Sequence, residues 1–112
     1  MKPYNLEERT FEFARDCRIL ISKLPKTISN IEDGKQLVKS SGSVGANYIE
    51  ANENLGDKDF KFRIKIARKE AKESLYWLQL LNALNPNSEA IDSLIQEANE
   101  LRKILSSILN KL

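Results

Sequence analysis

The chain has 112 residues, of which 41% are hydrophobic and 30% are charged, and its formal net charge is +2. This size and composition predict one compact domain, residues 1–112, and exclude a disordered or fibrous chain. A net charge of +2 is too small to indicate a nucleic-acid partner, so the distribution of charge matters more. The chain has no histidine, which removes the usual general base and the nucleophilic triads. We therefore predict a protein that is not an enzyme, with no cofactor and no bound metal.

Cys17 is the single cysteine, and it lies within an apolar helical pattern. Because one cysteine cannot form an intramolecular disulfide, we interpret it as a small core residue in a reducing compartment. The first residues lack an apolar signal region, and no hydrophobic run approaches the length needed to cross a bilayer. We expect a cytoplasmic protein without a membrane partner.

The first predicted helix begins after Asn5, which could cap it in a capping box with Glu8. Apolar residues then recur at spacings of four and three, Phe11 widens the stripe, and Pro25 ends the helix. The stripe consists of Leu6, Thr10, Phe13, Cys17, Leu20 and Leu24.

Asn30 is expected to cap a second helix, and Gly56 to end it in the left-handed conformation. The middle of this helix, residues 40–46, contains six small residues in seven. Two are glycines, which each cost about 1 kcal/mol relative to alanine in a helix interior. Propensity alone indicates a loop, but the apolar period continues through the segment, so we favour a continuous helix that a neighbouring helix approaches closely. The close-contact residues are Ser41, Gly42, Gly45 and Ala46.

The longest predicted helix, residues 57–85, is capped by Asp57 and ends before Pro86. It carries two apolar stripes separated by well over a quarter-turn. The first consists of Phe60, Ile64, Ala67, Ala71, Ser74, Leu78 and Leu81. The second consists of Phe62, Ile66, Trp77, Leu80 and Leu84. Because one core cannot easily cover both, we predict a homo-oligomer whose interface is the second stripe, with Trp77 as its anchor.

A row of positive charge lies between the two stripes. Its four residues fall within about 60° of helical arc, and Lys58 and Arg63 lie near them. The four are Lys61, Lys65, Arg68 and Lys72. One interpretation is that these six side chains bind phosphates of RNA or DNA without reading sequence. The alternative is a solvated face, or a row neutralised by acidic residues such as those of segment 88–100, within the bundle or across a subunit boundary.

Ser88 is expected to cap a fourth helix with one dense apolar stripe. The stripe contains Ile91, Leu94, Ile95, Ala98, Leu101, Leu105, Ile108 and Leu112, with Ile104 beside it. No strand-period segment, repeat or low-complexity tract interrupts the four helical patterns. The sequence therefore predicts an all-α fold, an antiparallel up-and-down four-helix bundle.

Three Glu-x-x-Glu pairs supply the remaining candidate chemistry. They are Glu50 with Glu53, Glu70 with Glu73, and Glu97 with Glu100. At this spacing both carboxylates share a helix face and could bind magnesium. All-helical nucleotide pyrophosphohydrolases use related acidic pairs on neighbouring helices, so a metal-dependent pyrophosphohydrolase is a minor alternative. The outward position of Glu70 and Glu73 weighs against it.

Residues 40–51, Ser-Ser-Gly-Ser-Val-Gly-Ala-Asn-Tyr-Ile-Glu-Ala, are similar to the signature of a bacterial four-helix-bundle family. The pattern Ser-hydrophobic-x-Ala-Asn-hydrophobic-x-Glu-Ala corresponds to residues 43–51, with Gly45 in the variable position. Segments 59–62, 66–70 and 73–78 resemble the family's third helix. The family comprises proteins encoded in intervening sequences of 23S ribosomal RNA genes. It is related to the accessory variability protein of diversity-generating retroelements.

The resemblance implies a bundle that assembles into a ring-shaped homo-oligomer, usually taken to be a homopentamer, with no established enzymatic activity. It also implies nucleic-acid binding for relatives with strongly positive surfaces, whereas this chain carries only +2. Two hypotheses remain open. One is an oligomeric nucleic-acid-binding accessory protein that uses the basic row, and the other is a structural or adaptor assembly whose partner is another protein.

Overall fold

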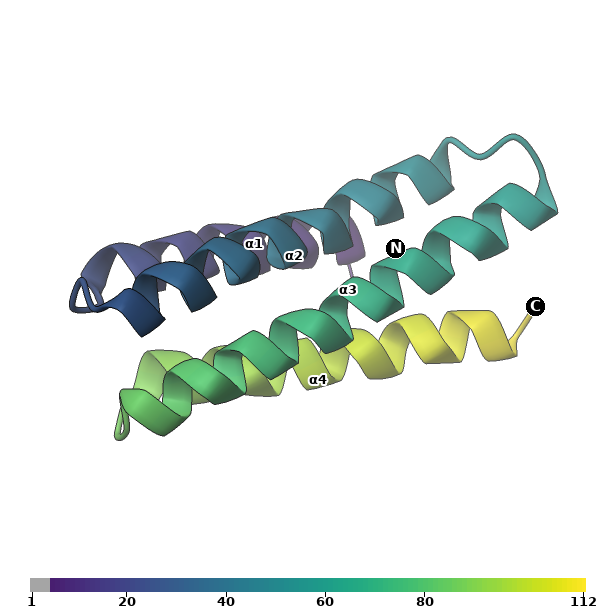
Figure 1. Ribbon diagram of the computed structural model, residues 1–112. Coiled ribbons are helices and arrows are strands. Elements are labelled where there is room, and N and C mark those ends of the chain that lie inside the picture. The colour runs from purple at the N-terminus through teal and green to yellow at the C-terminus, as the bar shows by residue number, and fades with distance from the viewer. Residues whose placement is uncertain (1–4) are drawn as a thin grey trace.

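The computed structural model describes residues 5–112, which form four helices. They are α1 (Leu6–Lys23), α2 (Ile28–Asn52), α3 (Asp57–Leu84) and α4 (Glu89–Asn110). Figure 1 shows α1 and α2 in one layer and α3 and α4 in the other, with each helix antiparallel to the one before it. The predicted all-α four-helix fold is therefore confirmed. The prediction about a signal region falls on the first four residues, which lie outside the described residues.

The interfaces between neighbouring helices differ in size. The largest interface lies between α2 and α3, which are also the longest helices at 25 and 28 residues. The interface between α3 and α4 is the next largest, and that between α1 and α4 is the smallest. Because α3 packs extensively on two neighbours, its first apolar stripe lies in the core of the bundle, whereas α1 and α4 leave an open seam.

The apolar stripes that the sequence predicts for the core are largely buried. In α3 the first stripe is buried except for Phe60, which packs against the core at its margin. Cys17 is also a buried core residue, as predicted. Two assignments are wrong. Phe11 is 67% exposed because it lies on the outer side of α1, and Leu112 is 63% exposed because α4 ends at Asn110.

Helix α2 runs unbroken through residues 40–46, as predicted. The small side chains there let α1 pack closely against α2. A Cβ added at Gly45 would lie only 2.8 Å from Thr10 Oγ1 of α1. A Cβ at Gly42 would meet only the end of the Arg18 side chain, at 3.1 Å. Ser41 is buried in the same contact region. Ala46 does not belong to this contact: it is exposed, because it follows Gly45 by about 100° around the helix.

The opposite side of the same α2 segment is joined to α3 by a buried polar pair. Ser40 Oγ and Ser74 Oγ are 2.8 Å apart, and each hydroxyl also lies within hydrogen-bonding reach of a carbonyl in its own helix. Both side chains are almost fully buried. The small residues of α2 therefore permit close packing against two neighbouring helices.

Two of the predicted N-caps, Asn5 and Asn30, are wrong. Asn5 occupies the N-cap position in a left-handed conformation (φ 43°, ψ 58°), but its side chain donates to the Glu8 carboxylate and caps no backbone N–H. Helix α2 is capped by Thr27, whose Oγ1 accepts from Asn30 N at 3.1 Å. Asn30 is buried instead, and its amide exchanges two hydrogen bonds, of 3.1 and 2.8 Å, with Asn85 at the end of α3.

The connection between α2 and α3 also differs from the prediction. Helix α2 already ends at Asn52, and Gly56 (φ 138°) precedes α3 instead of ending α2. Asp57 is consequently the first residue of α3, and Asp59 Oδ2 closes the turn by accepting from Leu55 N at 3.0 Å. The cap at Ser88 is confirmed, since its hydroxyl accepts from Ile91 N at 3.2 Å.

Candidate nucleic-acid interface

The predicted basic row lies along the side of α3 that faces α4. Arg68 is half-buried, and its Nη1 lies 3.4 Å from Ser106 Oγ on α4. Lys61, Lys65 and Lys72 share that side of α3 and are exposed to solvent. The row therefore borders a seam between two helices, so a ligand bound there would contact both.

Helix α4 contributes a cation that the sequence reasoning missed. Arg102 lines a groove together with Lys69 and Lys72 of α3. Its Nη1 lies 3.3 Å from Asn99 Oδ1, which is one turn earlier in α4. The only signal in the sequence was the position of Arg102 beside the apolar stripe of α4. We call the combined surface the basic strip, which consists of Lys61, Lys65, Arg68, Lys72 and Arg102.

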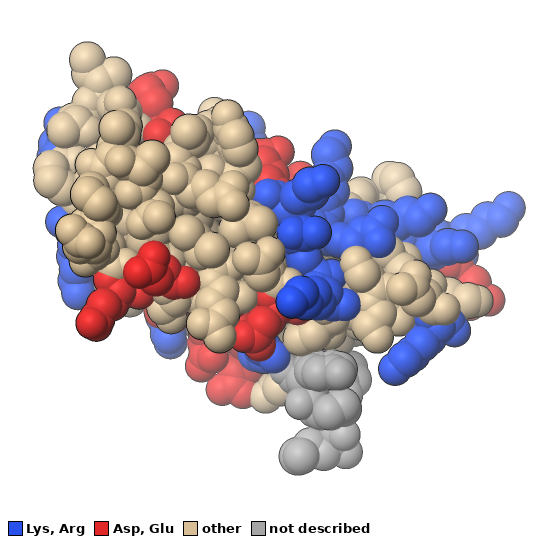
Figure 2. Space-filling model, turned by 90° about the horizontal axis from the view of Figure 1, so that it is seen from below, with Lys and Arg blue, Asp and Glu red and all other residues tan. Residues whose placement is uncertain are grey.

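Figure 2 views the bundle from the side formed by α3 and α4. Lys and Arg side chains gather on the half where α3 begins and α4 ends, and few acidic side chains separate them. The half near the α3–α4 turn shows mostly residues that are neither basic nor acidic. Basic side chains are thus concentrated at one end of this side of the bundle.

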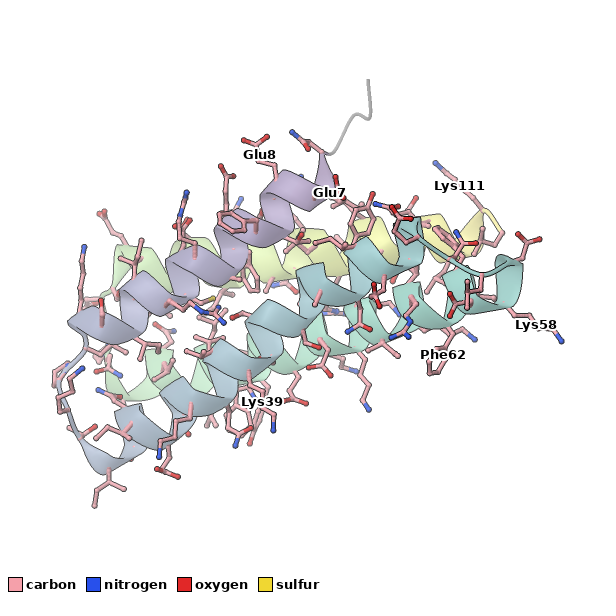
Figure 3. The ribbon with its side chains drawn as sticks, turned by 90° about the horizontal axis from the view of Figure 1, so that it is seen from above. Glu7, Glu8, Lys39, Lys58, Phe62 and Lys111 are labelled. Atoms are coloured by element: carbon pink, nitrogen blue, oxygen red, sulfur yellow. The ribbon has the colours of Figure 1, made fainter. Side chains whose placement is uncertain are left out.

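Of the two other predicted phosphate contacts, Arg63 lies away from the strip, whereas Lys58 lines a groove together with Lys61, a member of the strip. Arg63 is turned toward α2, with Nη1 3.5 Å from Asn47 Oδ1 and Nε 3.7 Å from Asp59 Oδ1. It does not reach the α4 side of α3, because it lies about 140° around the helix from Arg68. Lys58 is exposed in the first turn of α3. Figure 3 shows Lys58 at the same end of the bundle as Lys111.

The acidic residues of α4 do not neutralise the basic strip within the bundle. Glu97 and Glu100 face α1, where Arg9 Nη2 lies 2.6 Å from Glu97 Oε1 and 3.2 Å from Glu100 Oε1. The pKa of Arg9 is raised, chiefly by its hydrogen bond to Glu97. Within residues 5–112, no carboxylate lies within 4.0 Å of a strip cation. The sequence-based hypothesis of neutralisation inside the bundle is therefore wrong for Glu97 and Glu100.

The acidic side chains instead line the open seam between α1 and α4. Glu12 and Asp16 of α1 face Glu97 and Glu100 of α4 across a groove whose floor includes Phe13. Only Arg9 and Arg15 pair with these carboxylates in the described part of the chain. Helix α4 thus has an acidic side toward α1 and a basic side toward α3.

The second apolar stripe of α3 is only partly exposed. Phe62 and Leu84 are 58% and 64% exposed, and Figure 3 shows Phe62 directed away from the bundle. Ile66 and Leu80 are half-buried. Trp77, expected as the anchor of an interface, packs partly buried against the core, and its Nε1 donates to Glu73 Oε2 at 3.2 Å. Much of the predicted anchor is therefore covered by the core of the same chain.

Tyr76 is an exposed aromatic residue that the sequence reasoning did not identify. It is 54% exposed, and its ring packs edge-on against Trp77 with a centroid separation of 5.1 Å and an interplanar angle of 70°. Tyr76 lines the groove that also contains Lys72 and Arg102. An aromatic ring and several cations thus occupy one surface.

The acidic pairs considered for magnesium do not converge. Burial, and then the neighbouring Glu73, raises the pKa of Glu70, but no group of three or more His, Cys, Asp or Glu residues that could hold a metal ion occurs in the described residues. Glu97 and Glu100 are engaged by Arg9. In the described part of the chain, no helix is long and apolar enough to cross a membrane.

Comparison with known proteins agrees with the helical signature. The model of the family described as "23S rRNA-intervening sequence protein" matches residues 4–107. A solved structure from Bacteroides thetaiotaomicron, a protein of unknown function from the S23 ribosomal protein family, is 30% identical with a TM-score of 0.80. The alignment covers 92% of this chain and 96% of that one. The search of curated proteins finds no match. The chain therefore belongs to the family of 23S rRNA-intervening sequence proteins.

Proposed function

We propose that the protein is a non-enzymatic nucleic-acid-binding accessory protein that contacts phosphates through the basic strip. The observation that carries this proposal is that the strip gathers five cations from two helices without a carboxylate partner in the described residues. Like charges this close on one helix side repel each other, so an external anion would stabilise them. Phosphate contacts bind without reading the base sequence. The expected ligand is therefore RNA or DNA of any sequence.

The proposal includes assembly into a ring-shaped homo-oligomer, with a pentamer as the expected number. The exposed residues Phe62 and Leu84 would lie at the interface, with Ile66, Leu80 and the exposed edge of Trp77 beside them. Exposed apolar side chains of this size are typical of association surfaces. Repetition of the strip in each subunit would then compensate for the small charge of a single protomer.

The test is the salt dependence of binding to generic RNA and DNA. The variant Arg68→Glu/Lys72→Glu should lose affinity for all sequences alike. The plot of the logarithm of the binding constant against the logarithm of salt concentration should become shallower by roughly 2, because two phosphate contacts are lost. The control is Lys26→Glu/Lys35→Glu, which changes exposed lysines outside the strip. Each reversal changes the charge by two, so both double variants carry −2 instead of +2. Equal losses of affinity in both variants would show that net charge, and not the strip, accounts for binding. A parent protein that fails to bind near physiological salt would refute the proposal.

A second candidate is an adaptor assembly that binds another protein. The outer side of α1 favours it, because Phe11 and Ile19 are 67% and 44% exposed there and line one groove with Ala14 and Ser22. Exposed apolar side chains around a groove are typical of protein-binding surfaces. The variant Phe11→Ser/Ile19→Ser should then lose a protein partner and keep nucleic-acid binding.

A further inference from the structure

A groove beside Tyr76 combines aromatic and cationic side chains. Its volume is about 380 Å³, within the range of roughly 300–1,000 Å³ that is usual for sites that hold small ligands. It lies along the seam between α3 and α4. Its lining residues are Lys69, Lys72, Glu73, Leu75, Tyr76, Gln79 and Arg102. A planar group could enter this groove while an attached anion stays at its cationic margin.

The ring of Tyr76 is exposed yet held in place. Its edge-on contact with Trp77 fixes it against a side chain that is itself packed on the core and hydrogen-bonded to Glu73. Tyrosine also has few rotatable bonds, so ordering its ring on binding costs little conformational entropy. Tyr76 is therefore a suitable stacking platform for a flat, aromatic ligand.

Glu73 is the one carboxylate that lines the groove. Its Oε2 accepts the hydrogen bond from Trp77 Nε1, which turns this oxygen toward the tryptophan. Lys69, Lys72 and Arg102 outnumber it at the groove, so the local charge is positive. The groove thus favours a ligand that carries both an aromatic ring and a negative charge.

We propose that this groove binds an unpaired base of single-stranded nucleic acid, with the base stacked on Tyr76 and the flanking phosphates bound by Lys69, Lys72 and Arg102. The proposal rests on the proposed function and specifies its ligand. A cationic groove with an aromatic platform is how proteins bind single strands without sequence preference, because every base has a face that stacks. A duplex keeps its bases paired and stacked, so its phosphates would bind the cations but no base would stack on Tyr76. Single strands should therefore bind more tightly than a duplex of the same length.

The experiment compares three labelled ligands of equal length: a single strand, its duplex, and an abasic strand that keeps the phosphates. Fluorescence anisotropy measures their binding to the parent protein and to Tyr76→Ala, Tyr76→Phe and Phe11→Ala. Phe11→Ala is the matched control, because it removes an exposed aromatic residue on the outer side of α1, in a groove lined by α1 residues. Each variant is assayed at the protein concentration at which light scattering gives the parent's mass.

The parent should bind the single strand at least about fivefold more tightly than the abasic strand, which is the lower range for stacking one base on an aromatic ring. Tyr76→Ala should lose that difference and keep its duplex affinity, whereas Tyr76→Phe and Phe11→Ala should keep the difference. Equal affinity of the parent for the abasic strand and the single strand would overturn the inference, and this measurement needs no variant. A loss of duplex affinity or of oligomer mass in Tyr76→Ala would also overturn it, because Tyr76 would then support assembly.

The two proposals fail in different ways. If Tyr76→Ala behaves like the parent while Arg68→Glu/Lys72→Glu loses both ligands, the basic strip binds nucleic acid and the stacking groove is refuted. If the parent binds neither the single strand nor the duplex near physiological salt, both proposals are refuted together.

Discussion

Alanine substitutions at Gly45 and Gly42 should change stability in opposite directions. Both glycines lie in the same helix, so each replacement gains the same intrinsic propensity, about 1 kcal/mol. The surroundings differ. At Gly45 the new Cβ would lie 2.8 Å from Thr10 Oγ1 and 3.1 Å from Thr10 Cβ, both in a buried side chain. At Gly42 the new Cβ meets the guanidinium of Arg18 at 3.1 Å, which is exposed and free to move.

The expected size follows from these contacts. Overpacking a well-packed site costs about 1–3 kcal/mol, so Gly45→Ala should be destabilised by about 0–2 kcal/mol after the propensity gain of about 1 kcal/mol. At Gly42 the displaced Arg18 loses only surface hydrogen bonds to Ala14 O and Val38 O, of 3.0 and 3.3 Å. Gly42→Ala should therefore gain up to about 1 kcal/mol. The propensity gain cancels in the comparison, so the difference in unfolding free energy between the two variants should be the overpacking cost at Gly45, about 1–3 kcal/mol.

Urea denaturation followed by far-ultraviolet circular dichroism measures this difference. Both variants are compared at one protein concentration, because the proposed association would add to stability. A second test adds Thr10→Ala, which removes Oγ1 and leaves Cβ. The cost of Gly45→Ala should be smaller in that background, since the two sites share the contact. If Gly45→Ala proved as stable as Gly42→Ala, α1 would not approach α2 as closely as the structure has it.

Three further predictions concern the core and the surface. Burial raises the pKa of the Cys17 thiol to about 12 from its ordinary 9.0. The thiol therefore ionises first in the unfolded chain, and the free energy of unfolding should fall between about pH 9 and 12. At pH 8 the thiol should react with a thiol reagent no faster than the chain unfolds locally. Ser40→Ala and Ser74→Ala should each cost about 1 kcal/mol, and the double variant should cost less than their sum in urea denaturation, since each hydroxyl is the other's partner. Phe62→Lys/Leu84→Lys should lower the oligomer mass in light scattering without lowering helix content, and an unchanged mass would exclude this surface as the interface.

The helices could be predicted from the sequence because their apolar period and stop signals are local. The period places Ile64 and Leu78 in the core, and both are fully buried. The start of α2 was missed because Thr27 and Asn30 are both good caps and lie three residues apart. Only the tertiary hydrogen bonds between Asn30 and Asn85 decide between them, and no local pattern contains that information.

The candidate site was less predictable, because its membership depends on which helix lies on each side of α3. Arg63 and Arg68 are five residues apart and both looked like phosphate contacts, yet one faces Asn47 of α2 and the other Ser106 of α4. Arg102 joins the strip only through the packing of α4 on α3. A helical wheel gives the angle of each side chain but not the neighbour that it faces.

The two charged surfaces beside α4 limit how copies of this chain could assemble. If the basic strip of one subunit docked in the acidic groove of the next, at Glu12, Asp16, Glu97 and Glu100, ion pairs would hold the interface and the strip would be covered. That arrangement would dissociate as salt is raised, because exposed ion pairs are screened. An interface built on Phe62 and Leu84 would resist salt and leave the strip open to phosphates. Nucleic-acid binding by the strip therefore requires an assembly whose mass is unchanged at high salt while its affinity for RNA or DNA falls.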